Sequence, residues 1–308
     1  MQVLSLPGLV PRDVPERTVV ALGFFDGVHT AHAAVLGAAR ELAFRLALPL
    51  LVYTFTSCDP PKGGALLSDD DERAERFFAL GARYAVFSPF SSVAHLSPRE
   101  FMDDVLFGRL HAAAAAVGED FRFGRGAAGD ASLLGSAFAA AGGECRVLTP
   151  LLDGGAPISS SRIRAMLAAG DVSGAARLLG RPYSLTLPVL RGKSLGHTLG
   201  FPTANQVPGE GRAIPRFGVY VTGVTLPDGT SYFGITDVGT RPTVSGSEVR
   251  IETHLLGFSG DLYGKSLTVA FLHRLRDERT FSSLSELTER ITEDCKEAKE
   301  WILANGQG

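Results

Sequence analysis

The pattern of apolar residues along this chain changes near residue 182, and no other feature of the sequence constrains the fold as much. Before that point, short apolar runs alternate with longer stretches of helical periodicity, whereas after it one short strand-like run follows another. The length of 308 residues is about twice the ~150 residues of an average domain. We therefore expect two domains, one over residues 1–182 and one over residues 183–308.

The first domain is expected to be an open parallel sheet with helices on both faces, because buried strands and helices alternate in its sequence. The predicted strands are Thr18–Leu22, Pro49–Phe55, Tyr84–Phe87, Ala112–Ala116 and Cys145–Thr149. The predicted helices are His32–Ala47, Asp69–Leu80, Pro98–Leu110 and Ala131–Ala141. Alanine favours helices, but the alternation of strands and helices favours a strand for the alanine run.

The second domain is expected to be all-β, an antiparallel barrel or sandwich, with one helix at its end. Its predicted strands, which turns rich in Gly, Pro and Asp separate, are Ser184–Leu190, Gly218–Val224, Ser231–Val238, Val249–Leu256 and Ser266–His273. The predicted helix runs from Leu284 to about Ala304, and Ser283 with Glu286 forms a capping box at its start.

Charge, hydropathy and cysteine usage exclude several classes of protein. The net charge is −3 and no basic stripe is present, so we expect no nucleic-acid partner. The longest apolar run, Leu46–Phe55, is far shorter than the ~20 residues that span a bilayer, so we expect no membrane partner. Cys58, Cys145 and Cys295 are scattered, which argues against a disulfide framework or a structural zinc site and favours a cytoplasmic protein. The oligomeric state stays unknown.

The segment Gly23–His32 follows the first predicted strand and opens the first predicted helix. In open α/β sheets, ligands bind at the carboxyl ends of the strands, and helix N-termini favour anions. His29 and His32 stand three residues apart at this place, where two imidazoles suit hydrogen bonds to phosphate oxygens during phosphoryl or nucleotidyl transfer. The alternative is a glycine turn with two surface histidines.

Two further segments are compatible with phosphate binding. Ile158–Arg164 places three serines at a predicted helix start, followed by Arg162 and Arg164, which suits a triphosphate. Gly118–Gly126 combines turns, aromatic rings and charges after a predicted strand. Read alone, the first segment is equally an ordinary serine cap and the second is merely a loop.

Together, the three segments resemble the adenylyltransferase module of bacterial bifunctional riboflavin kinase/FAD synthetases. The motifs are G-x-F-D-G-x-H-x-x-H, a form of the HIGH-type nucleotidyltransferase signature, then G-x-D-F-R-F-G and I-S-S-x-R-I-R. The resemblance implies a Rossmann-like domain that transfers AMP from ATP to FMN and releases pyrophosphate. It also implies that ATP phosphates are held and polarised by His29, His32, Ser160, Ser161 and Arg164, and that the nucleotide pocket is shaped by Gly23, Asp26 and Asp120.

One segment departs from this family. Thr54–Pro60 reads T-F-T-S-C-D-P where the family has T-F-[DE]-P-H-P, so Cys58 stands in place of a histidine that contributes to the adenylylation site. A thiol cannot replace an imidazole as a cationic hydrogen-bond donor to phosphate. This departure keeps open a second reading, a riboflavin kinase whose adenylyltransferase domain is weakened or inactive.

The second domain contains the heptamer Leu199–Asn205, L-G-F-P-T-A-N, after its first predicted strand. Thr203 and Asn205 are two hard oxygen ligands two residues apart, which suits Mg²⁺ held jointly with substrate phosphates, although the same residues also suit a turn with self-satisfied side chains. Upstream, Gly192 and Lys193 belong to a basic segment that is a candidate flap over phosphates. Glu252 lies in an alternating run and is either a general base or an acid on the solvent face.

These residues fall into a pattern that resembles the riboflavin kinase module across residues 183–308. The pattern comprises L-G-F-P-T-A-N, then G-T-R-P-T at Gly239–Thr243, E-x-H-L-L at Glu252–Leu256 and L-R-D-E-x-x-F at Leu275–Phe281. The resemblance implies a six-stranded antiparallel barrel with a C-terminal helix. It assigns Thr203 and Asn205 to Mg–ATP and Glu252 to activating the ribityl 5′-hydroxyl, and it places Arg276 near the flavin.

The interpretation that accounts for both halves is a bifunctional enzyme with Mg²⁺ as its metal cofactor. It would convert riboflavin and ATP into FMN, and then FMN and ATP into FAD. A third reading, a flavin- or nucleotide-binding protein without turnover, is disfavoured because Thr203, Asn205 and Glu252 are all present.

Overall fold

The computed structural model describes residues 2–6, 13–61, 64–191, 201–243 and 246–305, and contacts between residues divide the chain into two compact units. The first unit is Met1–Ser160 and the second is Ser161–Gly308. Contacts therefore group residues 161–182 with the β-rich part of the chain. The assignment of one activity to residues 1–182 and the other to residues 183–308 stays a prediction.

The first unit contains a six-stranded sheet in which every pair of neighbouring strands is parallel, as predicted. Its order is β1 (Gln2–Ser5), β4 (Tyr84–Ser88), β3 (Leu50–Phe55), β2 (Thr18–Leu22), β5 (Ala112–Gly118) and β8 (Glu144–Leu148). The alanine run is strand β5, because it lies between β2 and β8 in the buried middle of the sheet. The edge strand β1 is mostly exposed, so it carries no buried pattern by which the sequence could predict it.

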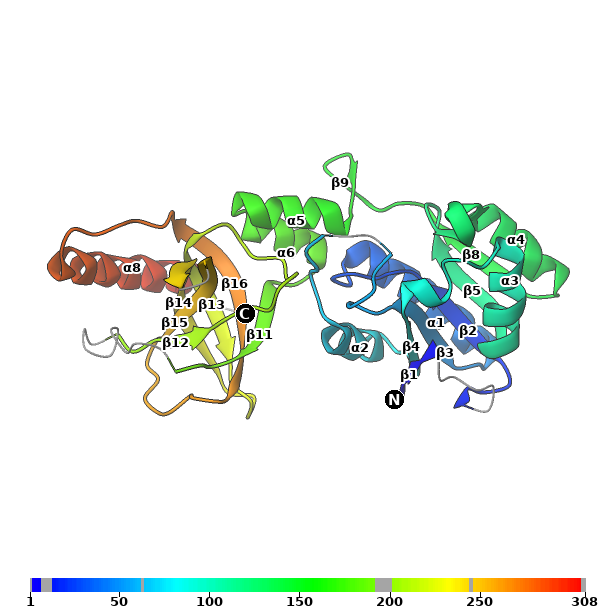
Figure 1. Cartoon of the computed structure of the whole chain (residues 1–308), viewed down its shortest axis with the longest axis horizontal. Coiled ribbons are helices and arrows are strands. Elements are labelled where there is room, and N and C mark those ends of the chain that lie inside the picture. Colours follow the sequence, from blue (N-terminus) through cyan, green and yellow to red (C-terminus); the bar gives the residue numbers. More distant parts are fainter. Residues whose placement is uncertain (1, 7–12, 62–63, 192–200, 244–245, 306–308) are drawn as a thin grey trace. The chain divides into compact units, whose positions relative to one another are not determined.

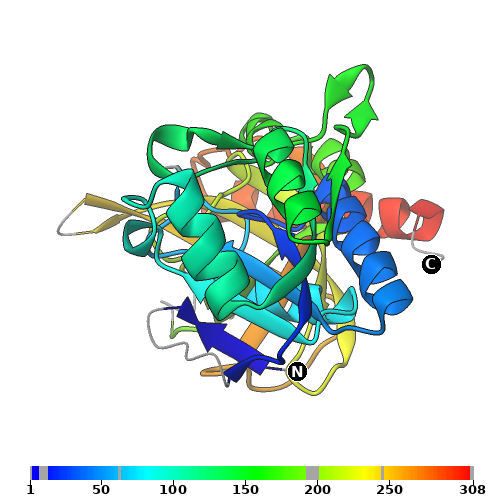
Figure 2. The same ribbon diagram turned by 90° about the vertical axis from the view of Figure 1, so that its right-hand side faces the viewer.

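Helices cover both faces of this sheet (Figure 1). One face packs against α1 (Thr30–Leu46) and α2 (Asp70–Ala79). The other face packs against α4 (Ala131–Ala140) and against α3 (Pro98–Glu100), which continues as the π-helix η4 (Phe101–Arg109). In Figure 2 this unit faces the viewer, with the blue helix α1 to one side of the strands. The predicted helices are confirmed, with Pro98–Leu110 divided into two helix types.

The remaining elements of the first unit are short. They are the 3₁₀ turns η3 (Phe90–Ser92) and η5 (Arg125–Ala127) and the strand pairs β6 (Arg122–Phe123) with β7 (Gly129–Asp130) and β9 (Leu152–Asp153) with β10 (Ala156–Pro157).

The strand order reverses between β2 and β5. From β2 the chain adds β3 and β4 on one side, and β5 and β8 lie on the other. Because all strands are parallel, the loops that follow β2 and β5 leave the sheet at the same edge. A crevice at such a switch point is the general ligand site of open α/β sheets, and the first two sequence motifs begin there.

The second unit is built on one curled antiparallel sheet of six strands, so the barrel alternative is favoured over a sandwich. Two helices, α5 (Ser160–Ala169) and α6 (Val172–Leu179), precede it. Its order is β11 (Tyr183–Pro188), β16 (Ser266–Arg276), β13 (Gly218–Thr225), β14 (Ser231–Thr243), β15 (Gly246–Leu255) and β12 (Ala204–Gln206). The two edges meet beyond β11, where the backbone N–H of Leu190 donates to the Asn205 carbonyl (2.7 Å).

The long helix α8 (Leu284–Asn305) packs on one face of the curled sheet, where Ala298 contacts the cluster of Val219, Val221 and Ile235. The predicted capping box is only half formed. Ser283 Oγ accepts from the Glu286 N–H (3.2 Å), but the Glu286 carboxylate accepts from the N–H of Ser282 (2.9 Å), one residue before the predicted donor. Among the described residues, no helix is both long and apolar enough to cross a membrane.

Candidate active sites

His29 is the N-cap of α1, at the end of the loop that follows β2. Its Nδ1 accepts from the backbone N–H of His32 (3.3 Å), so the proton of a neutral His29 ring sits on Nε2. Gly27 and Val28 both have positive φ angles (77° and 42°), which turn the backbone sharply enough to place His29 at the helix start. The sequence predicted a helix start at His32, and the cap lies one turn earlier.

The two predicted catalytic histidines lie side by side. The rings of His29 and His32 stack with their centroids 3.5 Å apart. Phe25 contacts His32 edge-to-face, with 5.2 Å between the ring centroids. His32 Nδ1 is buried and has no hydrogen-bond partner among the described residues. Burial, followed by the charges of His29 and Arg73, holds the pKa of His32 well below its usual value. The pair is therefore a compact donor group at an anion-favouring helix N-terminus.

Asp26 is buried and organises the loop from within. Its carboxylate accepts from the backbone N–H groups of Leu67 (2.8 Å) and Ser68 (3.3 Å), and Ser68 Oγ accepts from the N–H of Gly27 (2.9 Å). Ser160 Oγ donates to the Asp26 carbonyl (2.9 Å). The third sequence motif is thus brought to the first at Ser160, as a ligand site shared by both would require.

Ser161 and Arg164 lie one turn apart on α5, and Arg164 Nη2 donates to Ser161 Oγ (3.1 Å). Asp120 follows β5 and folds back over Gly118, whose Cα faces the Asp120 carboxylate so closely that a Cβ would lie 2.9 Å from Oδ1. A Cβ on Gly23 would likewise lie 2.8 Å from the Phe25 ring. A side chain at either position would therefore displace the neighbouring Asp120 or Phe25 side chain.

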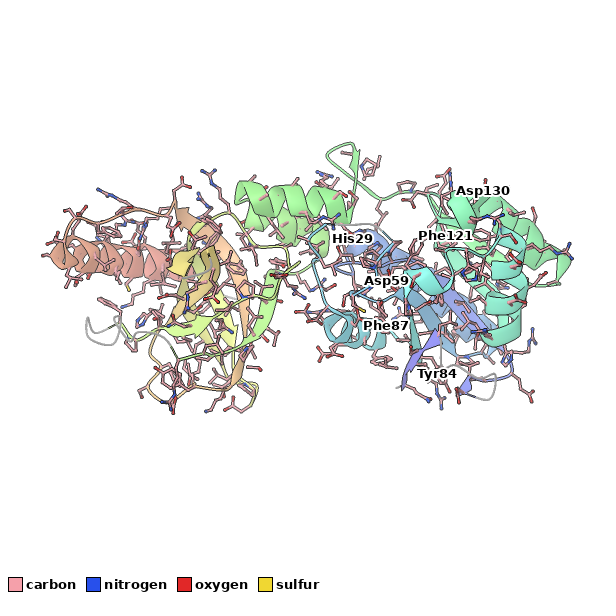
Figure 3. The ribbon with its side chains drawn as sticks, in the orientation of Figure 1. His29, Asp59, Tyr84, Phe87, Phe121 and Asp130 are labelled. Carbon is pink, nitrogen blue, oxygen red and sulfur yellow. The ribbon has the colours of Figure 1, made fainter. Side chains whose placement is uncertain are left out.

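The loop that contains Cys58 is held by its neighbours rather than by the thiol. The Ser57 N–H donates to Asp70 Oδ1 (2.8 Å), and Asp59 Oδ2 accepts from the Ser91 N–H (2.8 Å). Hydrogen bonds from the side chain and then the backbone of Ser91 lower the pKa of Asp59. Cys58 is exposed, with Sγ 3.5 Å from Thr56 Oγ1. Figure 3 labels His29, Asp59 and Phe87 toward the end of the unit at which the strands finish, and Tyr84 at the other end of β4. The place of the family's histidine is therefore open to solvent at this edge.

Arg73 is a residue of this site that sequence reasoning missed. It lies in the run D-D-D-E-R-A-E-R, which reads as an exposed, charged helix start, yet its side chain is only 1% exposed. The capping box of Asp69 and Glu72 is the sequence signal that could have found it. It fixes the start of the helix, and with this start Arg73 lies on the buried face together with Ala74 and Phe77.

In the second unit, the predicted kinase residues meet in one row across the sheet. Asn205 on β12 pairs directly with Glu252 on β15, and Glu252 pairs with Asp237 on β14. Val219 and then Arg276 continue the row on β13 and β16. Directly paired residues of antiparallel strands present their side chains on the same face of the sheet, so Asn205, Glu252 and Asp237 share one face.

Thr203 directly precedes β12 and Asn205 lies on it, at the end of that row. Asn205 Nδ2 lies 3.3 Å from the Thr203 carbonyl and 3.4 Å from Thr203 Oγ1, and the His254 Nδ1–H donates to the Pro202 carbonyl (2.9 Å). With the amide nitrogen turned inward, the Asn205 amide oxygen and the Thr203 hydroxyl are hard oxygen ligands. Such a pair fits Mg²⁺, which takes few protein ligands and completes its shell with water and substrate phosphates.

Asp237 was not predicted from the sequence. Burial, followed by the carboxylates of Glu278 and Glu252, raises its pKa to about 7, against the opposing effect of Arg276. Arg276 itself binds Asp294 of α8 through Nε (2.9 Å) and Nη2 (2.7 Å). Its predicted position near the flavin stays a prediction, and Gly192 and Lys193 lie outside the described residues.

A cavity of about 540 Å³ opens between α8 and β15, beside the Pro202–Asn205 turn. Its lining combines apolar side chains with charged ones of both signs, among them Phe201, His254, Lys296, Lys299, Glu300 and Leu303. The edge-to-face pair of Phe201 and His254 (5.6 Å) joins the cavity wall to the strand that carries Glu252.

Comparison with known proteins places both halves in one family. A family model of FAD synthetase matches residues 12–162, and one of riboflavin kinase matches residues 179–302. The bifunctional riboflavin kinase/FMN adenylyltransferase of Escherichia coli (strain K12) is 35% identical over 293 residues, 93% of each chain. The protein of the same description from Bacillus subtilis (strain 168) is 33% identical over 305 residues, 96% of each chain.

A solved structure shares the fold over nearly the whole chain. It is a crystal structure described as a macrolide-efflux protein from Streptococcus pneumoniae, with a TM-score of 0.87 and 29% sequence identity. The match covers 98% of this chain and 100% of that one. From the two family models and the relatives that match it nearly end to end, this chain belongs to the family of bifunctional riboflavin kinase/FMN adenylyltransferases.

Proposed function

We propose that the chain performs both reactions of its family, with the two groups of residues described above as the two active sites. It phosphorylates riboflavin with ATP to give FMN and ADP, and it then transfers AMP from a second ATP to FMN to give FAD and pyrophosphate. The observation that supports the proposal is the direct pairing of Asn205 with Glu252, which would bring a metal and phosphate ligand beside a general base.

In the kinase reaction, Glu252 accepts the proton of the ribityl 5′-hydroxyl of riboflavin. The resulting oxygen attacks the γ-phosphorus of ATP, the bond from that phosphorus to the β,γ-bridging oxygen breaks, and ADP leaves. Thr203 and Asn205 would hold Mg²⁺, which neutralises phosphate charge when bound. Because Asn205 pairs directly with Glu252, phosphates held by Thr203 and Asn205 would lie close to Glu252.

For the nucleoside of this ATP, the cavity between α8 and β15 is the best-placed site. It begins at Phe201, two residues before Thr203, so a phosphate chain bound at Thr203 leads directly into it. Its apolar wall suits a base, and the charged side chains of Lys296, Lys299 and Glu300 suit the polar edge of the nucleoside. If the base binds here, Phe201→Ala should raise the KM for ATP and leave the KM for riboflavin unchanged. A base-modified ATP analogue should then compete with ATP less effectively in the variant than in the wild type.

In the adenylylation reaction, a phosphate oxygen of FMN attacks the α-phosphorus of ATP, and pyrophosphate leaves as the α,β-bridging bond breaks. His29 and His32, at the N-terminus of α1, donate hydrogen bonds to the charge that builds on the phosphates. Ser160, whose hydroxyl donates to the Asp26 carbonyl of the same loop, is a further proposed phosphate contact, and Ser161 and Arg164 are proposed donors to the triphosphate. Asp26 and Asp120 shape the pocket through the loops that they hold.

Cys58 favours a second candidate function, a riboflavin kinase with weak adenylylation. Its exposed thiol supplies no cationic donor at the place where the family has an imidazole. The three free cysteines fit a reducing compartment, so the proposal includes a cytoplasmic location.

Incubation of the protein with riboflavin, ATP and Mg²⁺, followed by chromatographic separation of the flavins, tests the proposal. Formation of both FMN and FAD supports the bifunctional enzyme. FMN that does not proceed to FAD, even when FMN is supplied directly, supports the kinase with a weak second domain. Binding of flavin or ATP without any product would leave only a binding protein and overturn the proposal.

A further inference from the structure

The guanidinium group of Arg73 is the most completely buried charge of the first unit, and the functional assignments above do not use it. Nη1 donates to the Phe24 carbonyl (2.8 Å) and to Thr54 Oγ1 (3.1 Å). Nη2 donates to the Phe55 carbonyl (2.7 Å) and to Asp70 Oδ1 (2.5 Å). Burial of a charge is costly unless it is paired and hydrogen-bonded. These partners therefore offset the cost of burying the Arg73 guanidinium and fix its position.

The partners of Arg73 belong to two loops that matter for adenylylation. Phe24 lies two residues after β2, in the segment that leads to His29, and Phe55 ends β3, directly before the segment that contains Cys58. Thr54 Oγ1 donates to the Phe24 carbonyl as well (2.7 Å), so the two loops and Arg73 form one connected network. A single side chain thus fixes the separation of the loops that leave two neighbouring parallel strands.

Aromatic rings and the helix backbone hold the guanidinium from the remaining sides. The rings of Phe24 and Phe87 lie 5.1 and 5.2 Å from its central carbon, and Nε lies 3.4 Å from the Asp69 carbonyl. Every N–H of the group therefore has an acceptor, and the flat faces have aromatic contacts. A lysine in this place would keep the charge but could make only a part of these contacts.

Arg73 also acts electrostatically on the histidine pair. The charged and titratable groups that face His32 are His29 on its own helix and Arg73 on α2, and both disfavour the protonated imidazole after the larger effect of burial. The charge of Arg73 is balanced by its ion pair with Asp70 and by the nearby carboxylates of Asp26 and Asp69.

We propose that Arg73 is a positioning residue of the adenylylation site, which holds the histidine loop and the Cys58 loop at one separation and keeps a fixed positive charge near His32. This inference rests on the proposed function of the first unit. It concerns adenylylation alone, because every partner of Arg73 lies within Met1–Ser160.

Two variants separate the geometric part of the role from the electrostatic part. Arg73→Lys keeps the charge and loses the five-point clamp, and Arg73→Met removes both. In both variants, FMN adenylylation should fall by roughly tenfold to a hundredfold in kcat, because a displacement of ~1 Å in a positioned group costs about that much. Riboflavin phosphorylation by the same protein should stay unchanged, and a far-UV circular dichroism spectrum and Tm close to those of the wild type serve as the control for folding of the first unit.

The pKa of His32, followed by NMR and assigned with His32→Gln, is the second measurement. It should rise in Arg73→Met and stay near the wild-type value in Arg73→Lys, a difference that a purely structural role would not produce. A wild-type protein without FAD formation would instead count against the proposed function, and the NMR comparison still tests the charge. Normal adenylylation in Arg73→Met, or an unchanged His32 pKa in that same variant, would overturn the inference.

Discussion

Asn205 on β12 lies directly opposite Glu252 on β15, in the register that also brings Glu252 opposite Asp237. Residues 47 positions apart in the sequence are thereby held side by side on a rigid sheet, as 252 − 205 = 47. The proposed phosphate ligand Asn205 and the proposed base Glu252 lie on neighbouring strands and need no loop movement to meet, which suits a reaction that depends mainly on positioning.

Removal of either member of this pair should stop the kinase alone. Asn205→Ala or Glu252→Gln is expected to lower FMN formation by about 10²-fold or more, the scale of a lost general base. FMN-to-FAD conversion should continue, because the proposed adenylylation residues do not include Asn205 or Glu252. Chromatography with riboflavin or FMN as the starting flavin measures both rates. Loss of both activities in a folded variant would contradict the separation of the two sites.

Restoring an imidazole at the exposed Cys58 position should strengthen adenylylation. A charge-assisted hydrogen bond to phosphate is worth ~1.5–3 kcal/mol, so Cys58→His is expected to raise kcat/KM for FMN adenylylation by about tenfold or more. Cys58→Ser, which supplies no cation, is the matched control and should have no such effect. An equal rate in the His and Ser variants would show that another group already serves that phosphate.

The raised pKa of Asp237, about 7, makes the stability of the second unit depend on pH. Between about pH 4 and pH 7 the folded protein keeps a proton that the unfolded chain releases, so the free energy of unfolding falls as the pH rises through this window. Asp237→Asn removes the effect and should raise Tm, by more at pH 8 than at pH 5. Fluorescence of Trp301, the single tryptophan, reports the transition.

Asp228→Asn is the control for that experiment, because Asp228 is an exposed carboxylate whose pKa the backbone N–H of Thr230 lowers. It should raise Tm at neither pH. The same gain in Tm for Asp237→Asn at both pH values would show that titration is not its cause.

Gln206 should fix the position of β12, and with it Asn205, by joining β12 to the opposite side of the curled sheet. Its buried amide Nε2 donates to the carbonyls of Leu187 (2.5 Å) and Leu267 (3.1 Å), which lie at the opposite edge from β12. Gln206→Leu leaves both carbonyls without this donor and should lower the free energy of unfolding by ~1–3 kcal/mol. Urea unfolding followed at Trp301 measures the change.

Thr186→Val is the matched comparison for Gln206→Leu, because it removes an exposed hydroxyl pair with Thr268 (2.9 Å) at the same edge of the sheet. Its effect should stay within ~0.5 kcal/mol, as for most exposed substitutions. Equal losses in the two variants would mean that Gln206 does not close the sheet.

Local pattern was sufficient for the elements whose burial is periodic. The buried run of β2 and the helix α8 are where the sequence predicts them, and the motifs around His29, Ser160, Thr203 and Glu252 identify the family that the comparisons show. By contrast, β12 is a strand of three residues, Ala-Asn-Gln, without an apolar alternation. It is a strand only because β15 offers it hydrogen bonds, and these come from residues far along the chain.

The sequence by itself determined the two kinds of domain, the residue types at each site and the chemistry that those types permit. Only the tertiary structure decided that Arg73 is buried, that Asp237 stands beside Glu252 and that Gln206 reaches across the sheet. The physical reason is that burial, pKa and cross-strand contact depend on what other parts of the chain supply around a residue. A charged run such as D-D-D-E-R reads the same whether or not two neighbouring strands offer their carbonyls to one arginine.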